Sequence, residues 1–193
     1  MANRPLTIKE RKAWEFAKDA HKHQVRKFIN LPYFDAHVSK VNGIVKQYTT
    51  DEDILCAALL HDVLEDCFDD MKEGYQVISE MFGSRVADLV VEVTSIGDEI
   101  DHDYDGSKTK YLTNKMIKMS SDALIIKLAD RLQNISDAFT ASPRFRKKYT
   151  NETLDIISQL EKSRTFNRIH LRLISDIKAK LKNIESIFKI KRF

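Results

Sequence analysis

The residues best suited to chemistry lie in one short segment, Ala57–Asp66, an apolar run that ends in His61, Asp62, Glu65 and Asp66. A histidine and an aspartate beside a buried face lose hydration, and a bound cation would compensate for that loss. Glu65 follows His61 by four residues and Asp66 follows Asp62 by four, so on a helix each carboxylate lies one turn further on. We therefore predict a divalent metal site with two acidic side chains that can position water and accept its proton.

Two further segments could complete this site. His37 lies near the start of the preceding predicted helix, and residues 125–131 form a second apolar run that reaches a carboxylate, Asp130. Asn134 follows Asp130 by four residues and shares its helix face. The predicted metal ligands are His37, His61, Asp62 and Asp130. Such a mixed set suits an octahedral divalent ion with positions left for water or substrate. Manganese or iron fits better than a closed structural zinc site, which favours thiolates, but the residues alone leave Mg²⁺ and Zn²⁺ open.

The combination of a cation and two acids favours hydrolysis of a phosphoester or a pyrophosphate ester. A bound divalent ion lowers the pKa of water and shields the charge that develops on a phosphoryl oxygen. Glu65 and Asp66 would then be the catalytic residues that activate the water.

The elements that must position these residues are predicted to be helices almost throughout. Five glycines and three prolines in 193 residues favour long helices joined by short loops. Thr7 and Glu10 fit a capping box that begins a helix ending near His23. Further helices are predicted over 35–47, 51–65, 71–82, 84–93, 108–119 and 121–139, with one or two beyond Pro143, whereas 97–106 is predicted to be an acidic loop. We expect an all-α protein with a single domain over residues 1–193.

Composition narrows the class of protein. A chain of 193 residues can bury one sizeable core and is too short for two comfortable domains. No apolar run approaches the roughly 20 residues that span a bilayer, and the first residues lack an apolar signal segment. Cys56 and Cys67 have no CxxC spacing, which is typical of a reducing compartment. We expect a cytoplasmic protein that does not bind membranes.

The C-terminal part of the chain is basic. Residues 144–193 carry 14 Lys and Arg against 5 Asp and Glu, a net charge of +9, whereas the rest of the chain has a net charge of −6. This extension could attract nucleic acid, but no aromatic-interleaved stripe or nucleic-acid motif accompanies it, so a solvated helix face is favoured. Apolar residues also recur there at spacings of three and four, namely Ile174, Ile177, Leu181, Ile184 and Phe188. That stripe suits either a docked terminal helix or the seam of a homo-oligomer.

The motifs, taken in order, resemble the HD-domain superfamily, whose pattern is H…HD…D, and within it the hydrolase domain of the Rel/SpoT alarmone proteins and the free-standing small alarmone hydrolases. Residues 20–27 resemble AHxGQxRK and residues 32–37 resemble PYxxH. Residues 61–66 match HDxxED, residues 127–134 resemble KLADRLHN, and residues 151–154 resemble the family's ETL helix. The ordered set covers about residues 20–155 and implies an HD-type helical bundle.

This resemblance implies a manganese-dependent 3′-pyrophosphohydrolase that converts (p)ppGpp to GDP or GTP and pyrophosphate. It assigns the metal to the four ligands above and water activation to Glu65 and Asp66. It implies substrate contacts from Arg26 and Lys27 along the guanine base, from Asn134 near the metal, and from Lys108 or Lys110 to the phosphates. The small nucleotide would be the partner, and a chain without a synthetase or regulatory domain resembles the stand-alone hydrolases.

Two departures from the family pattern leave alternatives open. His23 replaces the glycine of AHxGQ, and Asn30 replaces the glycine before PY, both on the side of the base. Another substrate, such as (p)ppApp, a 3′-phosphorylated nucleotide or a nucleoside monophosphate, is therefore the alternative reading. A non-catalytic nucleotide sensor or a nucleic-acid-binding module would be expected to lack a metal ligand or an acid of the catalytic pair, and this chain has them all.

Overall fold

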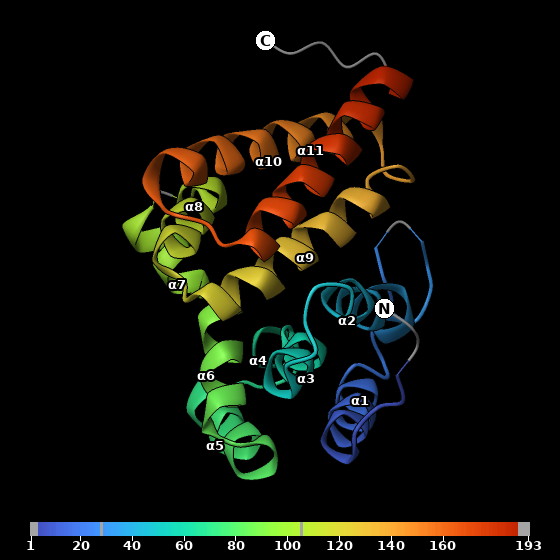
Figure 1. Ribbon diagram of the computed structural model, residues 1–193, viewed down its shortest axis with the longest axis vertical. Helices are drawn as coiled ribbons and strands as arrows, with labels where there is room; N and C mark the ends of the chain where they lie inside the picture. Colours follow the sequence, from blue (N-terminus) through green and yellow to red (C-terminus); the bar gives the residue numbers. More distant parts are fainter. Residues whose placement is uncertain (1–3, 28, 105, 189–193) are drawn as a thin grey trace. The chain divides into compact units, whose positions relative to one another are not determined.

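The computed structural model describes residues 4–27, 29–104 and 106–188, apart from the side chain of Asp98, and confirms the all-α fold class (Figure 1). Within those residues, extended pairing is limited to an isolated bridge between Val25 and Pro32. Contacts divide the chain into two compact units, residues 1–94 and 95–193, which we call the first and the second unit. The single domain predicted over 1–193 stays a prediction.

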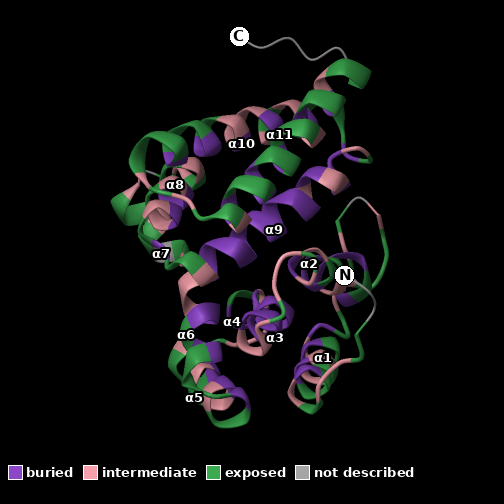
Figure 2. Cartoon of the chain, in the orientation of Figure 1, coloured by how far each residue is buried: buried purple, intermediate pink, exposed green. Residues whose placement is uncertain are grey.

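The first unit is built around one buried helix. Its helices are α1 (Ile8–Ala20), the π-helix η1 (Phe34–Val38), α2 (Ser39–Val45), α3 (Glu52–Leu60), α4 (Val63–Asp66), α5 (Met71–Phe82) and α6 (Ser84–Val93). α3 packs against α1, α2 and α6, and every residue from Ile54 to Leu60 is buried (Figure 2). Because the apolar run continues through α3 to His61, the chemical residues begin where the core ends.

Local signals fix the ends of several of these helices. The Thr7 side chain accepts a hydrogen bond from the Glu10 amide and the Glu10 side chain accepts one from the Thr7 amide, which confirms the predicted capping box. Asp51 caps α3, since its side chain accepts hydrogen bonds from the amides of Asp53 and Ile54. Gly83 ends α5 with a φ of 91°, a conformation that side chains disfavour, and α6 follows directly.

Two predicted helices are interrupted. The helix predicted over 51–65 ends at Leu60, and the chain turns at His61 and Asp62 before the short α4. His61 Nδ1 lies 2.9 Å from the carbonyl of Ala58, which in a continuing helix would accept from the Asp62 amide, so a side chain competes with the helix ladder there. The helix predicted over 35–47 begins with the π-helical turn of η1 rather than as a regular α-helix.

The second unit comprises α7 (Gly97–Asp103), α8 (Lys108–Lys118), α9 (Ser121–Asp137), α10 (Pro143–Ser163) and α11 (Arg168–Phe188). α9 is buried over most of its length and packs against α10 and α11 (Figures 1 and 2). Ile174, Ile177, Leu181 and Ile184 are buried, whereas Phe188 at the end of the stripe is 36% exposed. The stripe therefore docks α11 within the unit, and the homo-oligomer stays a prediction.

The acidic loop predicted over 97–106 is wrong for most of its length, because α7 occupies residues 97–103. An acidic residue in the first turn of a helix is favoured by the helix dipole, and α7 carries Glu99 there. Tyr111 of α8 supports the start of α7, since its hydroxyl accepts a hydrogen bond of 3.1 Å from the Ile96 amide. Asp105, which also belongs to the predicted loop, lies outside the described residues.

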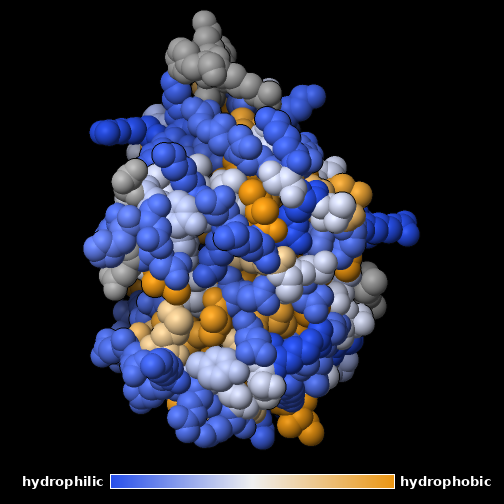
Figure 3. Space-filling model, turned by 90° about the vertical axis from the view of Figure 1, so that its left-hand side faces the viewer, coloured by the Kyte–Doolittle hydropathy of each residue, from blue (hydrophilic) through white to orange (hydrophobic). Residues whose placement is uncertain are grey.

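The surface agrees with a composition in which 32% of residues are charged, since hydrophilic side chains cover most of the face in Figure 3. Among the described helices, none combines the length and the apolarity that a membrane crossing requires.

Candidate metal centre

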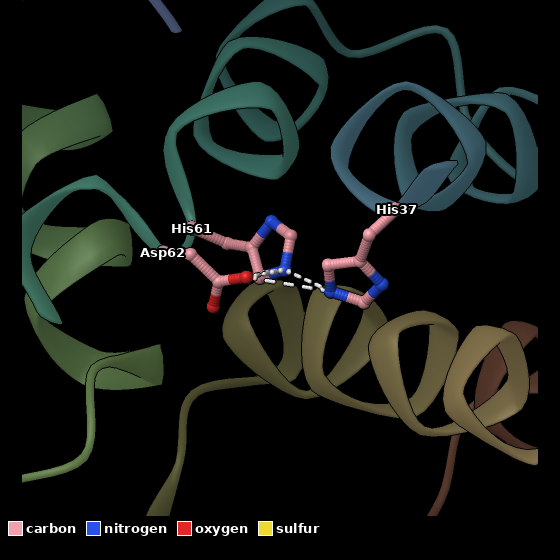
Figure 4. Close-up of side chains that lie close together, drawn as sticks. All are labelled: His37, His61 and Asp62. Atoms are coloured by element: carbon pink, nitrogen blue, oxygen red, sulfur yellow. Dashed lines mark hydrogen bonds and ion pairs between the residues drawn. The ribbon is translucent and has the colours of Figure 1, made fainter. Parts of the chain in front are cut away.

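Three side chains of the first unit converge on one point, His61 and Asp62 from the turn after α3 and His37 from η1 (Figure 4). The Nε2 atoms of the two histidines are 3.2 Å apart. Asp62 Oδ2 lies 3.1 Å from Nε2 of His61 and 3.3 Å from Nε2 of His37. Both imidazoles are 1% exposed, so the structure brings three of the four predicted ligands together in a nearly closed site.

The contact that ends α3 also orients His61 as a ligand. A carbonyl oxygen only accepts hydrogen bonds, so the 2.9 Å contact with Ala58 requires the proton of a neutral His61 ring to be on Nδ1. The Nε2 lone pair then faces the other two side chains, so this tautomer leaves Nε2 able to bind a metal.

Asp62 supplies the negative charge of this His37–His61–Asp62 cluster. Burial alone would raise the pKa of its carboxyl, but the neighbouring imidazoles of His61 and His37 hold that pKa well below its usual range. An anionic oxygen and two imidazole nitrogens form a donor set that suits a divalent cation. The residues present therefore fit a metal ion.

Tyr33 also reaches the cluster, and the sequence patterns did not single it out. Its hydroxyl donates a hydrogen bond of 2.6 Å to Asp62 Oδ2. The PYxxH pattern has two residues between its tyrosine and its histidine, whereas this chain has three between Tyr33 and His37. The π-turn accommodates the additional residue, since the Ser39 amide bonds back to the carbonyl of Phe34 across five residues. This spacing was the signal that could have drawn attention to Tyr33.

The two predicted catalytic acids lie on α4, beside the cluster. The Asp66 amide donates to the carbonyl of Asp62 over 2.9 Å, so the predicted one-turn separation survives the break after α3. Both Glu65 and Asp66 are exposed over much of their surface. Partial burial of the Asp66 carboxyl, followed by the negative charges of Asp62 and Glu65, raises its pKa to about 6. Asp66 can therefore take up a proton close to neutral pH.

Arg26 and Lys27 belong to the loop that joins α1 to η1. The Arg26 guanidinium lies 5.4 Å from the centre of the Tyr33 ring, and the Arg26 amide donates to the carbonyl of Leu31 over 2.8 Å. Lys27 is exposed. Arg26 is thus held next to Tyr33, which itself contacts the cluster.

His23 and Asn30 replace glycines of the family pattern in this loop, and both residues can adopt the backbone conformation found there. Asn30 has a φ of 56°, and asparagine tolerates this left-handed region better than other residues with a side chain. Among the described non-glycine residues only Asn30 has a positive φ, so His23 stands where the backbone does not require glycine.

The remaining predicted residues belong to the second unit. On α9, Asn134 Nδ2 donates to Asp130 Oδ1 over 2.5 Å, and Lys127 Nζ lies 3.5 Å from Asp130 Oδ2. Lys108 and Lys110 are exposed in the first turn of α8. The role of these residues, with Asp130 as the fourth ligand, stays a prediction.

This chain matches the HD-domain model and is similar to proteins named for (p)ppGpp hydrolysis. The model of the HD domain matches residues 13–165, a range that includes residues of both units. The guanosine-3′,5′-bis(diphosphate) 3′-pyrophosphohydrolase of Aquifex aeolicus is 34% identical over 151 residues, which cover 77% of this chain and 20% of that protein. The bifunctional (p)ppGpp synthase/hydrolase SpoT of Escherichia coli is 34% identical over 152 residues, 78% of this chain and 21% of that protein.

A solved structure is also similar. It is described as a metazoan ortholog of SpoT that hydrolyses ppGpp, and it matches with a TM-score of 0.74 and 26% identity, covering 98% of this chain and 100% of that one.

The chain belongs to the HD-domain family, and its resemblance to the Rel/SpoT hydrolase domain is confirmed by these relatives. It spans about a fifth of the length of the curated relatives it matches. An HD domain implies a divalent metal, and the His37–His61–Asp62 cluster is a candidate site for that ion.

Proposed function

We propose that this protein is a manganese-dependent 3′-pyrophosphohydrolase of (p)ppGpp that acts in the cytoplasm. The observation that carries the proposal is the convergence of His37, His61 and Asp62 beside an acid whose pKa is raised to about 6. The relatives named for ppGpp hydrolysis support the substrate class. The two cysteines are free thiols, which is consistent with a reducing compartment.

The cluster would hold the cation through two imidazole nitrogens and one carboxylate oxygen, with Asp130 as the proposed fourth ligand. Manganese suits such a mixed nitrogen and oxygen set and leaves coordination positions for substrate and water. When bound, the ion supplies a lowered pKa for water and shields charge on the phosphoryl oxygens.

The two catalytic acids would orient the attacking water and accept its proton. Glu65 orients the attacking water, and Asp66 accepts its proton as the new bond from oxygen to phosphorus forms. The bond between that phosphorus and the ribose O3′ breaks, and O3′ leaves with a proton. The products are pyrophosphate and GDP or GTP, so atoms and charge balance with one water consumed. A base with a pKa of about 6 is mostly ionised at neutral pH and therefore ready for this step.

Substrate contacts would come from basic and amide side chains. One face of the Arg26 guanidinium packs over Tyr33, and we propose that its opposite face carries the guanine base, with Lys27 beside it. Asn134 would contact the nucleotide near the metal, and Lys108 or Lys110 would bind the phosphates.

The test is a hydrolysis assay with purified protein and Mn²⁺ across ppGpp, ppApp, a 3′-phosphorylated nucleotide and nucleoside monophosphates. We expect pyrophosphate release from ppGpp, its loss after chelation, and its restoration by Mn²⁺. Asp62→Ala is the inactive control. Release of pyrophosphate from ppApp alone would favour the adenine alarmone, and phosphate release from a monophosphate without pyrophosphate from either alarmone would overturn the proposal.

A further inference from the structure

We infer that Tyr33 is a positioning residue that fixes the Asp62 carboxylate for metal binding and joins the metal site to the Arg26 loop. The inference rests on the proposed function for its kinetic part, whereas its metal-binding part can be tested independently. The Tyr33 side chain contacts both Asp62 and Arg26.

The first contact is made by the hydroxyl. Tyr33 donates over 2.6 Å to Asp62 Oδ2, the same oxygen that lies 3.1 Å and 3.3 Å from the two imidazoles. A carboxylate oxygen has two lone pairs, so it can accept this hydrogen bond and still offer a lone pair to a cation. A hydrogen bond to an anionic oxygen is short and comparatively strong, so it opposes rotation of the carboxylate away from the histidines.

The second contact is made by the ring. Its centre lies 5.3 Å from that of His37 and 5.1 Å from that of His21, and Arg26 packs over it at 5.4 Å. The Tyr33 amide also donates to the carbonyl of Gln24 over 2.9 Å. The ring is therefore held on several sides, and loss of the ring would release the Arg26 loop as well as the hydroxyl.

The backbone of this chain supports the same role. With three residues between Tyr33 and His37, the π-turn of η1 absorbs the additional residue while both side chains still reach Asp62. π-turns within helices are uncommon and occur often at functional sites. The π-turn therefore lets Tyr33 and His37 reach the same carboxylate with three residues between them.

The hydroxyl is tested with Tyr33→Phe, which removes one oxygen and keeps the ring. We expect the affinity of the metal-free protein for Mn²⁺, measured by titration without nucleotide, to fall by about 10- to 100-fold, the usual effect of losing a partner that orients a ligand. The matched control is Tyr75→Phe, which breaks another tyrosine–aspartate hydrogen bond, 3.0 Å to Asp88 Oδ1, between α5 and α6. That variant should bind Mn²⁺ like the wild type.

The ring is tested by comparing Tyr33→Phe with Tyr33→Leu at saturating Mn²⁺. We expect KM for ppGpp to stay near the wild-type value in the first variant and to rise in the second, because only the second removes the surface under Arg26. Wild-type Mn²⁺ affinity in Tyr33→Phe would overturn the positioning role, and equal KM values in the two variants would overturn the link to Arg26. If the wild type binds Mn²⁺ but hydrolyses no alarmone, the proposed function fails while the metal titration still decides the role of Tyr33.

A measurement on the wild type covers the case in which Tyr33→Phe does not fold. The Tyr33 hydroxyl proton, shared with Asp62, should exchange with solvent more slowly in NMR spectra than the hydroxyl proton of Tyr75. Equally fast exchange of the two protons would count against the proposal.

Discussion

Two apolar runs in this protein lead to a carboxylate, yet they present it in different ways. In the first unit α3 ends at Leu60, and the turn directs the adjacent side chains of His61 and Asp62 to the same point. In the second unit α9 continues to Asp137, so Asp130 stays in the middle of a helix with Lys127 and Asn134 on its face. One region is organised by a break in the helix and the other by helical spacing.

The local contacts of the two regions differ as well. At the end of α3 the imidazole of His61 contacts the carbonyl of Ala58 one turn back in the helix, and this contact sets the His61 tautomer. On α9 the residue after the carboxylate is Arg131, whose guanidinium donates to Thr153 Oγ1 over 2.9 Å. Similar apolar runs are therefore followed by different local contacts, one within the end of α3 and one from α9 to α10.

The largest effect is expected from removing a ligand at the break. His61→Ala should lower Mn²⁺ affinity by more than about 100-fold, beyond the range for residues that only orient a ligand, and should abolish pyrophosphate release from ppGpp. Asp130→Ala should lower the Mn²⁺ affinity and the rate of pyrophosphate release less than His61→Ala does if the cluster of the first unit binds the ion by itself. Titration with Mn²⁺ and a pyrophosphate assay measure both quantities.

The control for this pair is His102→Ala, which removes an exposed histidine of α7 and should change neither quantity. A greater loss in Asp130→Ala than in His61→Ala would reverse the comparison and assign the dominant ligand to α9.

The next effect concerns the acids that follow the break. Asp66→Asn and Glu65→Gln should each lower kcat by about 10²- to 10⁴-fold, the contribution typical of a positioned acid or base, while Mn²⁺ binding is retained. The reason is that both residues lie on α4 and outside the set of clustered donors. Asp69→Asn, which removes a nearby exposed acid, is the matched control. A loss of metal affinity as large as that of His61→Ala would make the altered residue a ligand instead.

Much of the helical framework was predictable because its signals are local. The Thr7 capping box and the helix predicted over 71–82 depend on short-range signals, and both are present. The approach of His37 to His61 was also anticipated, because an ordered set of motifs carries long-range information that periodicity lacks.

The errors arise where a side chain overrides a local preference. Where α3 ends at Leu60, the His61 ring contacts the carbonyl of Ala58, and the π-turn at Phe34 coincides with one additional residue before His37. Helical periodicity in the sequence does not predict either the end of α3 or the π-turn. α7 was missed because an acidic sequence between Gly97 and Gly106 resembles a loop, although an acid such as Glu99 in the first turn stabilises a helix.

A smaller effect is expected on the helical side of the comparison. Asn134→Ala removes the 2.5 Å hydrogen bond to Asp130 and should lower kcat/KM for ppGpp by about tenfold, at the lower end of the range for residues that orient a ligand. Lys127 still lies 3.5 Å from the other oxygen of Asp130 in this variant, so the carboxylate keeps a partner. Steady-state kinetics at saturating Mn²⁺ measure the change, and Asn183→Ala, at an exposed position of α11, is the control. An unchanged kcat/KM would show that α9 does not depend on this contact.

The smallest expected effect is on stability, and it arises because the carboxylates of the two regions have different charged neighbours. Lys127 lies beside the carboxylate of Asp130 on α9 and offsets its charge. For Asp66, partial burial, followed by the negative charges of Asp62 and Glu65, raises the pKa to about 6. A raised pKa means that the stabilising contribution of the protonated group, complete below the usual aspartate pKa near 4, is lost as pH rises through about 6.

Asp66→Asn should therefore stabilise the metal-free protein above pH 7 and leave its stability near pH 4 unchanged. The gain should be less than about 1 kcal/mol, because Asp66 is only partly buried and solvent screens its charge. Urea unfolding at several pH values, with Asp69→Asn for comparison, measures the difference. Saturating Mn²⁺ should shrink it, since the cation offsets the same negative charges. If Asp66→Asn stabilises the protein equally at every pH, the pKa of Asp66 is not raised by burial and by the charges of Asp62 and Glu65.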